Sequence, residues 1–104
     1  SGKVAGMSKI RRSAKGEDCT IRLPGICNFN PETTVLCHPN THRAGKGKGL
    51  KAHDALGAYG CSACHAVVDG VRCNMPRCDV ELAFWHGHCE TFIKLIQKGL
   101  VDIA

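Results

Sequence analysis

The sequence predicts a small α+β domain that is stabilised by zinc and carries a long helix at its C-terminal end. The chain has 104 residues, which is the length of one domain. Leu, Ile, Val and Phe together make 23 residues, and five residues are aromatic, so the hydrophobic core is thin. Eight cysteines and six histidines are available for the metal cross-link that a small domain with a thin core usually needs.

The positive charge is concentrated in the first half of the chain. The formal net charge is +5, with ten basic and three acidic residues in 1–52 and four and six in 53–104. We expect residues 1–16 to be a basic arm with a short helix near residues 8–14, and residues 17–104 to be the domain. A solvated tail is the alternative interpretation of the arm, and a vector-derived extension is one explanation for residues 1–6.

Several classes of protein are excluded by composition. No apolar run reaches the roughly 18 residues that a membrane span needs, so we expect no membrane partner. No apolar signal segment follows the N-terminus, which favours the reducing cytoplasm of a cell. In that compartment clustered cysteines indicate metal more often than disulfides.

The predicted elements before Cys61 are short. Residues 19–23 alternate like a strand, and Pro24 and Gly25 then turn the chain. Residues 33–37 are β-branched and apolar, which predicts a second strand. Residues 40–60 contain five glycines and four basic residues, which predicts a flexible, positively charged loop, with a backbone phosphate cradle as the alternative.

Two helices follow the loop. The first begins after Ser62 as N-cap and stops at Gly70. The second spans residues 79–98 and stops at Gly99. Its apolar residues follow helical spacing and predict one buried stripe, made by Leu82, Trp85, Cys89, Phe92 and Ile96. Gly87 within this helix is either a weak point or a place of close packing.

Two cysteine pairs predict a zinc site. Cys19 and Cys27 flank the Pro-Gly turn, and Cys61 and Cys64 form a C-x-x-C. Two such loops can present four thiolates to one tetrahedral Zn²⁺. A cluster of buried thiols, a thioredoxin-like redox motif and c-type haem attachment at the C-x-x-C-His sequence are the alternatives. A second zinc site from Cys73, Cys78, Cys89, His86 and His88 also stays open.

A candidate catalytic metal site follows the C-x-x-C motif. His65 and Asp69 lie four residues apart at the start of the first helix, so both side chains project from one face. His38 ends the strand of residues 33–37. A strand, a long loop and a helix that begins with His are the plan of a ββα-metal nuclease site, although a surface His–Asp contact is the commoner explanation of such a pair.

Two blocks of the sequence resemble a known family. Residues 15–38 (KGEDCTIRLPGICNFNPETTVLCH) and 57–70 (GAYGCSACHAVVDG) are similar to the YbcO-type nucleases of bacteriophages and prophages, which are grouped with HNH endonucleases. The resemblance covers most of residues 9–100. It implies an HNH-like ββα-metal fold with a structural four-cysteine zinc beside a catalytic metal.

The resemblance also implies residue roles. His38 resembles the general base of the HNH motif, and His65 resembles the metal ligand that follows C-x-x-C. Asp69 takes the place of a second ligand on the helix. Two features depart from the family pattern. Cys37 stands where a metal-binding Asp or His often precedes the first His, and the central Asn has no clear match. The nearest polar candidates are Asp54, His53 and Asn40, and of these we expect Asp54 to be the third ligand.

The expected function is metal-dependent endonuclease cleavage of DNA in phage recombination or DNA processing, with Mg²⁺ or Mn²⁺ as the catalytic ion. Phage or host recombination proteins are the expected protein partners. The residues expected to contact phosphates are Arg11, Arg12, Arg43, Lys46, Lys48 and Lys51. A non-catalytic zinc module that binds DNA, or a protein adaptor, is the alternative.

Overall fold

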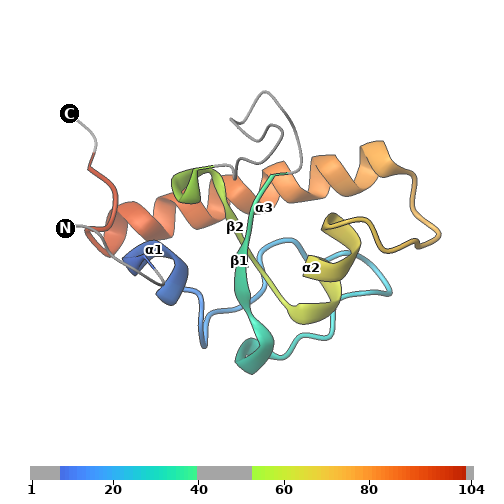
Figure 1. Cartoon of the computed structure of the whole chain (residues 1–104), viewed down its shortest axis with the longest axis horizontal. Helices are drawn as coiled ribbons and strands as arrows, with labels where there is room; N and C mark the ends of the chain where they lie inside the picture. The colour runs from blue at the N-terminus through green and yellow to red at the C-terminus, as the bar shows by residue number, and fades with distance from the viewer. Residues whose placement is uncertain (1–7, 40–52, 103–104) are drawn as a thin grey trace.

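The structure is a computed structural model that describes residues 8–39 and 53–102. A two-stranded antiparallel sheet lies at its centre, and one long helix packs along it (Figure 1). The elements in chain order are α1 (Lys9–Arg12), η1 (Pro31–Thr33), β1 (Val35–Cys37), η3 (Asp54–Leu56), β2 (Ala58–Gly60), α2 (Ser62–Val68) and α3 (Arg77–Gln97). The predicted α+β class with a C-terminal helix is confirmed. No helix in the described ranges is long and apolar enough to cross a bilayer.

The sheet and α2 form a consecutive ββα unit. β1 confirms the strand predicted from residues 33–37, but it begins only at Val35 because Pro31–Thr33 form a 3₁₀ turn. Its partner β2 pairs Leu36 with Tyr59. β2 falls within residues 40–60, which were predicted to be a loop, so that prediction is wrong for residues 58–60. The strand has only three residues, all buried, and therefore shows no alternation that a sequence pattern could reveal.

The strand predicted at residues 19–23 is not present. Arg22 has a φ of 49°, a left-handed conformation that no strand residue adopts. The backbone N–H of Thr20 donates a single hydrogen bond to the carbonyl of Tyr59 at 2.8 Å. The segment then turns at Leu23, whose carbonyl accepts from Cys27 N–H at 2.9 Å. The chain therefore forms a tight loop that brings the first two cysteines together.

The two helices begin close to where they were predicted to begin. Cys61 is the N-cap of α2 in place of the predicted Ser62, because its sulfur accepts the N–H of Cys64. Gly70, with a φ of 123°, follows the end of α2 as predicted. The 21-residue helix α3 begins at Arg77, two residues earlier than predicted, and ends just before Gly99.

The inward face of α3 is not the predicted stripe. The buried residues are Val80, Phe84, Gly87, Thr91 and Leu95. Leu82 is 56 % exposed, and Cys89 is also exposed. The reason is close packing at Gly87, where an added Cβ would lie 2.9 Å from Thr20 Oγ1 and 3.0 Å from the Thr20 carbonyl. The helix can approach the loop of residues 19–23 only with this face inward.

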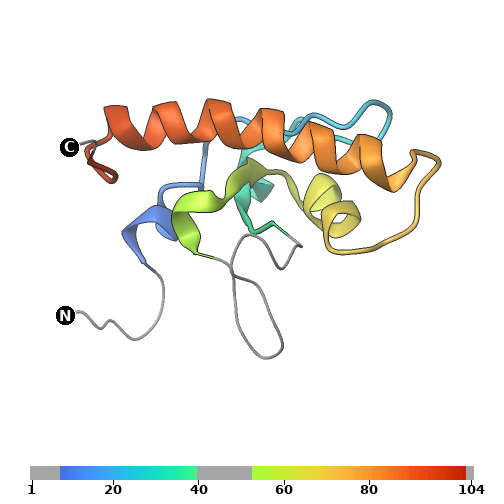
Figure 2. The ribbon, with the colours of Figure 1, turned by 90° about the horizontal axis from the view of Figure 1, so that it is seen from above.

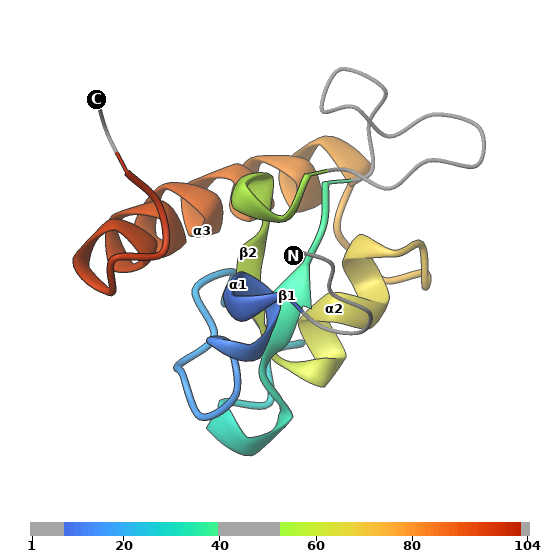
Figure 3. The same cartoon turned by 60° about the vertical axis from the view of Figure 1, so that its left-hand side comes forward.

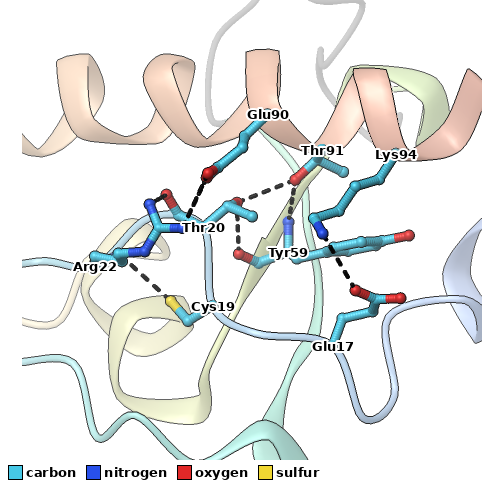
Figure 4. A network of polar contacts seen from close by, with 8 residues as sticks. All are labelled: Glu17, Cys19, Thr20, Arg22, Tyr59, Glu90, Thr91 and Lys94. Atoms are coloured by element: carbon cyan, nitrogen blue, oxygen red, sulfur yellow. Dashed lines mark hydrogen bonds and ion pairs between the residues drawn. The ribbon is translucent and has the colours of Figure 1, made fainter. Parts of the chain in front are cut away.

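A polar network fixes α3 to the sheet (Figure 4). The Thr91 hydroxyl accepts the backbone N–H of Tyr59 at 3.0 Å and lies 3.0 Å from the Thr20 hydroxyl. Thr20 in turn donates to the Tyr59 carbonyl at 2.9 Å. These groups are buried, and their partners satisfy them. Figure 2 shows α3 along one side of the molecule, with β2 and α2 on its inner side.

The core consists of two clusters of buried residues. The larger includes Cys19, Cys61 and Cys64 together with Val80 and Phe84 of α3, and Cys27 packs against it. The smaller joins Ala14, Leu36, Tyr59 and Leu95, with Ile10 of α1 packed against it. The described part of the expected basic arm therefore packs on the sheet, and β1 lies between α1 and α2 (Figure 3).

Candidate metal centre and active-site residues

The four cysteines predicted to bind zinc lie together. The sulfurs of Cys19, Cys27, Cys61 and Cys64 are all within 4.8 Å of one another. Cys19 and Cys27 come from the loop before β1, whereas Cys61 and Cys64 come from the first turn of α2. Cys27 is partly exposed, and the other three are buried. The cluster could hold a metal ion, and four sulfurs from two loops are the donor set that structural zinc prefers.

Backbone N–H groups surround this cluster. Cys19 Sγ accepts from Arg22 N–H, Cys64 Sγ accepts from Leu23 N–H, and Cys61 Sγ accepts from the N–H groups of Asn28 and Cys64, each at 3.4 Å. Hydrogen bonds from N–H groups favour the charged form of an acceptor. The loop conformation, including the left-handed Arg22, thus prepares sulfurs to act as thiolate ligands.

The acidity of the thiols is consistent with this assignment. A hydrogen bond from the Cys64 side chain lowers the pKa of Cys19 to about 4, although burial opposes the change. That same hydrogen bond, followed by burial, raises the pKa of Cys64, and burial raises the pKa of Cys27 to about 11. Neighbouring thiolates repel one another, so a bound cation is what allows all four sulfurs to ionise. The residues present fit zinc.

The other cysteines do not form a second cluster. Within residues 8–39 and 53–102, the four sulfurs above are the only group of three or more His, Cys, Asp or Glu side chains close enough to share an ion. Cys73 lies near the Met75 carbonyl, and Cys78 and Cys89 are exposed. His86 and His88 do not join them, and His88 Nδ1 instead lies 2.9 Å from the Gly57 carbonyl. Cys37 is fully buried in the core, where burial raises its pKa.

His38 follows β1 and is paired with Asp54. Nε2 of His38 lies 2.7 Å from Oδ1 of Asp54, which is the first residue of η3. A carboxylate only accepts hydrogen bonds, so Nε2 of His38 is the donor, and Nδ1 carries the lone pair in the neutral form of the imidazole. Asp54 also accepts from the Ser8 hydroxyl and lies 3.4 Å from Nη2 of Arg11. Both partners belong to the N-terminal turn of α1.

Asp54 stays ionised in this environment. Burial alone would raise its pKa, but the hydrogen bonds from Ser8 and His38 and the charge of Arg11 outweigh burial, and the net pKa is lowered. The carboxylate is therefore a stable negative partner for the imidazole of His38 across the neutral range.

His65 and Asp69 form the pair that their spacing predicts. Nε2 of His65 in α2 lies 3.1 Å from Oδ2 of Asp69, the C-cap residue that follows the helix. The structure does not bring Asp54 into a common ligand group with them. Of the three residues expected to hold the catalytic ion, only His65 and Asp69 therefore lie together, and Asp54 instead pairs with His38.

A half-open hollow lies next to His65 and Arg11. It has a volume of about 280 Å³ and is lined by Arg11, Lys15, Glu32, Thr34, Val35, Leu36 and His65. Arg11 links the hollow to the His38–Asp54 pair, because its side chain lines the hollow and its Nη2 reaches Asp54. Arg12 is exposed on α1. The other expected phosphate contacts, Arg43, Lys46, Lys48 and Lys51, lie outside the described residues.

Sequence patterns did not identify Ser8 and Thr34 as candidate site residues. A Ser at the start of an expected helix is a typical N-cap. The Ser8 hydroxyl does accept the N–H of Arg11, at 3.1 Å. Its bond to Asp54 joins residues 46 positions apart, and no local pattern encodes such a contact. Thr34 looks like an ordinary β-branched residue in the sequence.

Comparisons with known proteins agree on one family. The family model described as "Putative nuclease YbcO" matches residues 8–100. The proteins named "Putative nuclease YbcO" from Escherichia coli (strain K12) and "Putative nuclease ybcO" from Enterobacteria phage 82 are each 43 % identical over 63 residues, which is 61 % of this chain. The match spans 65 % of each relative, slightly less than two thirds of its length.

A solved structure shares the fold. It is described as "Structure of a putative bacteriophage protein from Escherichia coli str. K-12 substr. MG1655". The TM-score is 0.73 at 28 % identity, and the match covers 88 % of this chain and all of the other. The family match extends from α1 to the end of α3 and includes every candidate site residue that the structure describes. The chain therefore belongs to the YbcO family.

Proposed function

We propose that this chain is a metal-dependent endonuclease that hydrolyses phosphodiester bonds in DNA, with an HNH-like ββα site. The observation that carries the proposal is the presence of two His–carboxylate pairs, His38–Asp54 after β1 and His65–Asp69 at α2. Arg11 relates the pairs, because it contacts Asp54 and lines the hollow that His65 also lines. Membership of a family whose relatives are named nucleases supports it. Those relatives come from a bacterium and a bacteriophage, and we extend the proposal to a role in phage recombination or DNA processing in the host cytoplasm.

His38 is the proposed general base. Asp54 holds Nε2, which leaves Nδ1 of His38 free to accept a proton from the attacking water. Asp54 acts through His38 and is therefore a positioning residue. Ser8 and Arg11 hold the carboxylate in turn, so α1 contributes to the site although it lies before the ββα unit.

His65 and Asp69 are the proposed ligands of the catalytic divalent ion. Mg²⁺ commonly takes only one or two protein ligands and fills its other positions with water and phosphate oxygens, so the two ligand atoms of His65 and Asp69 are sufficient. When bound, Mg²⁺ or Mn²⁺ would polarise the phosphoryl oxygen and stabilise the leaving oxyanion. Arg11 and the basic residues of the first half of the chain would neutralise neighbouring phosphates.

Cleavage of supercoiled plasmid by the full chain tests this proposal. We expect nicking in Mg²⁺ or Mn²⁺ and a loss of about a hundredfold or more in His38→Ala, since that is the usual contribution of a general base. His65→Ala should also lose cleavage, with partial recovery in excess Mn²⁺ because its defect is weaker ion binding. His86→Ala is the matched control, because His86 is exposed on α3 outside the site.

Two results would contradict the proposal. One is a parent protein that cuts no plasmid, linear duplex or branched DNA in any divalent ion. The other is equal cutting by the parent, His38→Ala and His65→Ala, since a contaminating nuclease would respond to neither substitution. Either result would favour a zinc-stabilised module that binds DNA or protein without catalysis.

A further inference from the structure

Two polar atoms at the hollow between α1, β1 and α2 have no hydrogen-bond partner among the described residues. They are Oγ1 of Thr34 and Nε of Arg11, and both atoms are buried. Thr34 is only 3 % exposed, and both side chains line the hollow. A buried polar atom without a partner destabilises a folded protein, and such atoms are rare unless they have a role. Their presence at one hollow points to a ligand.

The chemistry of the lining identifies the class of ligand. Arg11 and Lys15 can only donate hydrogen bonds, and the Thr34 hydroxyl can donate one. Phosphate, which presents several acceptor oxygens and negative charge, suits these donors. Glu32 also lines the hollow, and Asp54 pairs with Arg11, so the two cations face two carboxylates and the preference for phosphate rests on the hydrogen-bond donors.

The remaining wall is apolar. Val35, which is 40 % exposed, and Leu36 line it, and an uncharged sugar ring suits such a surface. The volume of about 280 Å³ lies just below the range of about 300–1,000 Å³ that is usual for ligand sites, so the hollow suits no more than one sugar-phosphate unit.

The position of the hollow relates it to the candidate active site. His65 lines it directly, and Arg11 reaches from it to the carboxylate that holds His38. We propose that the hollow binds one sugar-phosphate unit of the DNA strand, next to the bond that is cut, with the phosphate held by Arg11, Lys15 and Thr34. The identity of the strand rests on the proposed function, whereas the preference for phosphate rests on the donors alone.

Thr34→Val is the sharpest test, because it replaces the hydroxyl with a methyl group of similar size. Removal of an unpartnered buried hydroxyl should raise the melting temperature of the free protein by about 4 °C or more. The same variant should bind a fluorescein-labelled 12-base-pair DNA about tenfold more weakly, measured by anisotropy in Ca²⁺ with the strands checked for integrity. A residue with a purely structural role would not combine higher stability with weaker binding.

Lys15→Gln provides a second measurement, and Lys9→Gln is its matched control. Both lysines belong to the same basic segment and are exposed, but only Lys15 lines the hollow. Lys15→Gln should weaken binding about fivefold and reduce the slope of log affinity against log salt by about one, as expected for one lost phosphate contact. Lys9→Gln should change affinity less than twofold. Arg11 is unsuitable as the test because it also contacts Asp54.

A methylphosphonate scan of the same DNA locates the phosphate. One uncharged linkage should weaken binding by the parent and have little further effect on Thr34→Val.

The proposal is overturned if Thr34→Val melts no higher than the parent, if it binds as tightly, or if the parent binds no DNA. If the parent cuts DNA and these variants bind as it does, the phosphate site fails and the nuclease proposal stands. If the parent cuts nothing and the binding effects appear, the nuclease proposal fails and the phosphate site stands.

Discussion

At the residue scale, the role of Asp54 is decided by contacts that lie far apart in the sequence. His38 is 16 residues from Asp54, and Ser8 is 46 residues from it. The sequence identified His38 and Asp54 as functional candidates, but it placed Asp54 on the metal. A carboxylate within 2.7 Å of an imidazole and beside Arg11 is better suited to orient that imidazole than to bind an ion.

Asp54→Asn tests this role through both activity and stability. Plasmid cleavage should fall about tenfold or more, because an amide does not fix the protonated Nε2 of His38 as a carboxylate does. The lowered pKa of Asp54 means that its ionised form stabilises the folded chain above its ordinary value of 3.8. That stability is lost as the pH falls through the lower folded value.

The stability difference between the parent and Asp54→Asn should therefore be largest near neutral pH and should shrink as the pH falls below about 3.8, measured by urea unfolding at each pH. A stability difference that stays constant down to the acid range would show that the charge of the Asp54 carboxylate contributes nothing to the stability of the folded chain.

At the element scale, short-range patterns predicted some elements and failed for others. The C-x-x-C spacing, the β-branched run before His38 and the glycines after each helix correctly located the cysteine cluster, β1 and the ends of α2 and α3. β2 was not predicted because Ala-Tyr-Gly has no alternation of polar and apolar residues. Residues 19–23 do alternate and were therefore predicted to be a strand, but Arg22 adopts a positive φ and no strand forms there. Tertiary contacts decided each of these cases.

The inward face of α3 also could not be predicted from the periodicity of its hydrophobic residues. Periodicity favoured the more hydrophobic stripe through Leu82 and Cys89, yet the face with Gly87 and Thr91 is buried. Gly87 permits contact with Thr20, and the Thr91 hydroxyl satisfies buried groups of Thr20 and Tyr59. Close packing at Gly87 and the hydrogen bonds of Thr91 therefore outweigh the greater hydrophobicity of the predicted stripe.

Gly87→Ala distinguishes packing from helix propensity. Propensity alone would stabilise α3 by about 1 kcal/mol. The new methyl group would instead meet the Thr20 carbonyl at 3.0 Å, which is backbone and cannot move freely. We expect a net destabilisation of about 1–3 kcal/mol in denaturant unfolding. Cys89→Ala, two residues further along on the exposed face, should be close to neutral. A more stable Gly87→Ala would contradict the close contact between α3 and the loop of residues 19–23.

At the scale of the whole molecule, the four-cysteine cluster holds the first loop against α2. The larger core cluster is built around these cysteines, and the described sheet has only two strands of three residues. A core of this size contributes little net stability without a cross-link. We therefore expect the positions of His65 in α2, of Asp69 at its end and of His38 beyond β1 to depend on a metal at this cluster.

Zinc content and melting temperature test that dependence most directly. Protein purified without chelator should contain one Zn²⁺ per chain by elemental analysis, because four sulfurs lie within 4.8 Å of one another. Cys61→Ser should lose the zinc and unfold or aggregate, whereas Cys89→Ser, on the exposed face of α3, should retain both zinc and melting temperature. Strong chelation of the parent should reproduce the Cys61→Ser result. A parent protein that contains no zinc and melts at the same temperature with and without chelator would contradict this account of the fold.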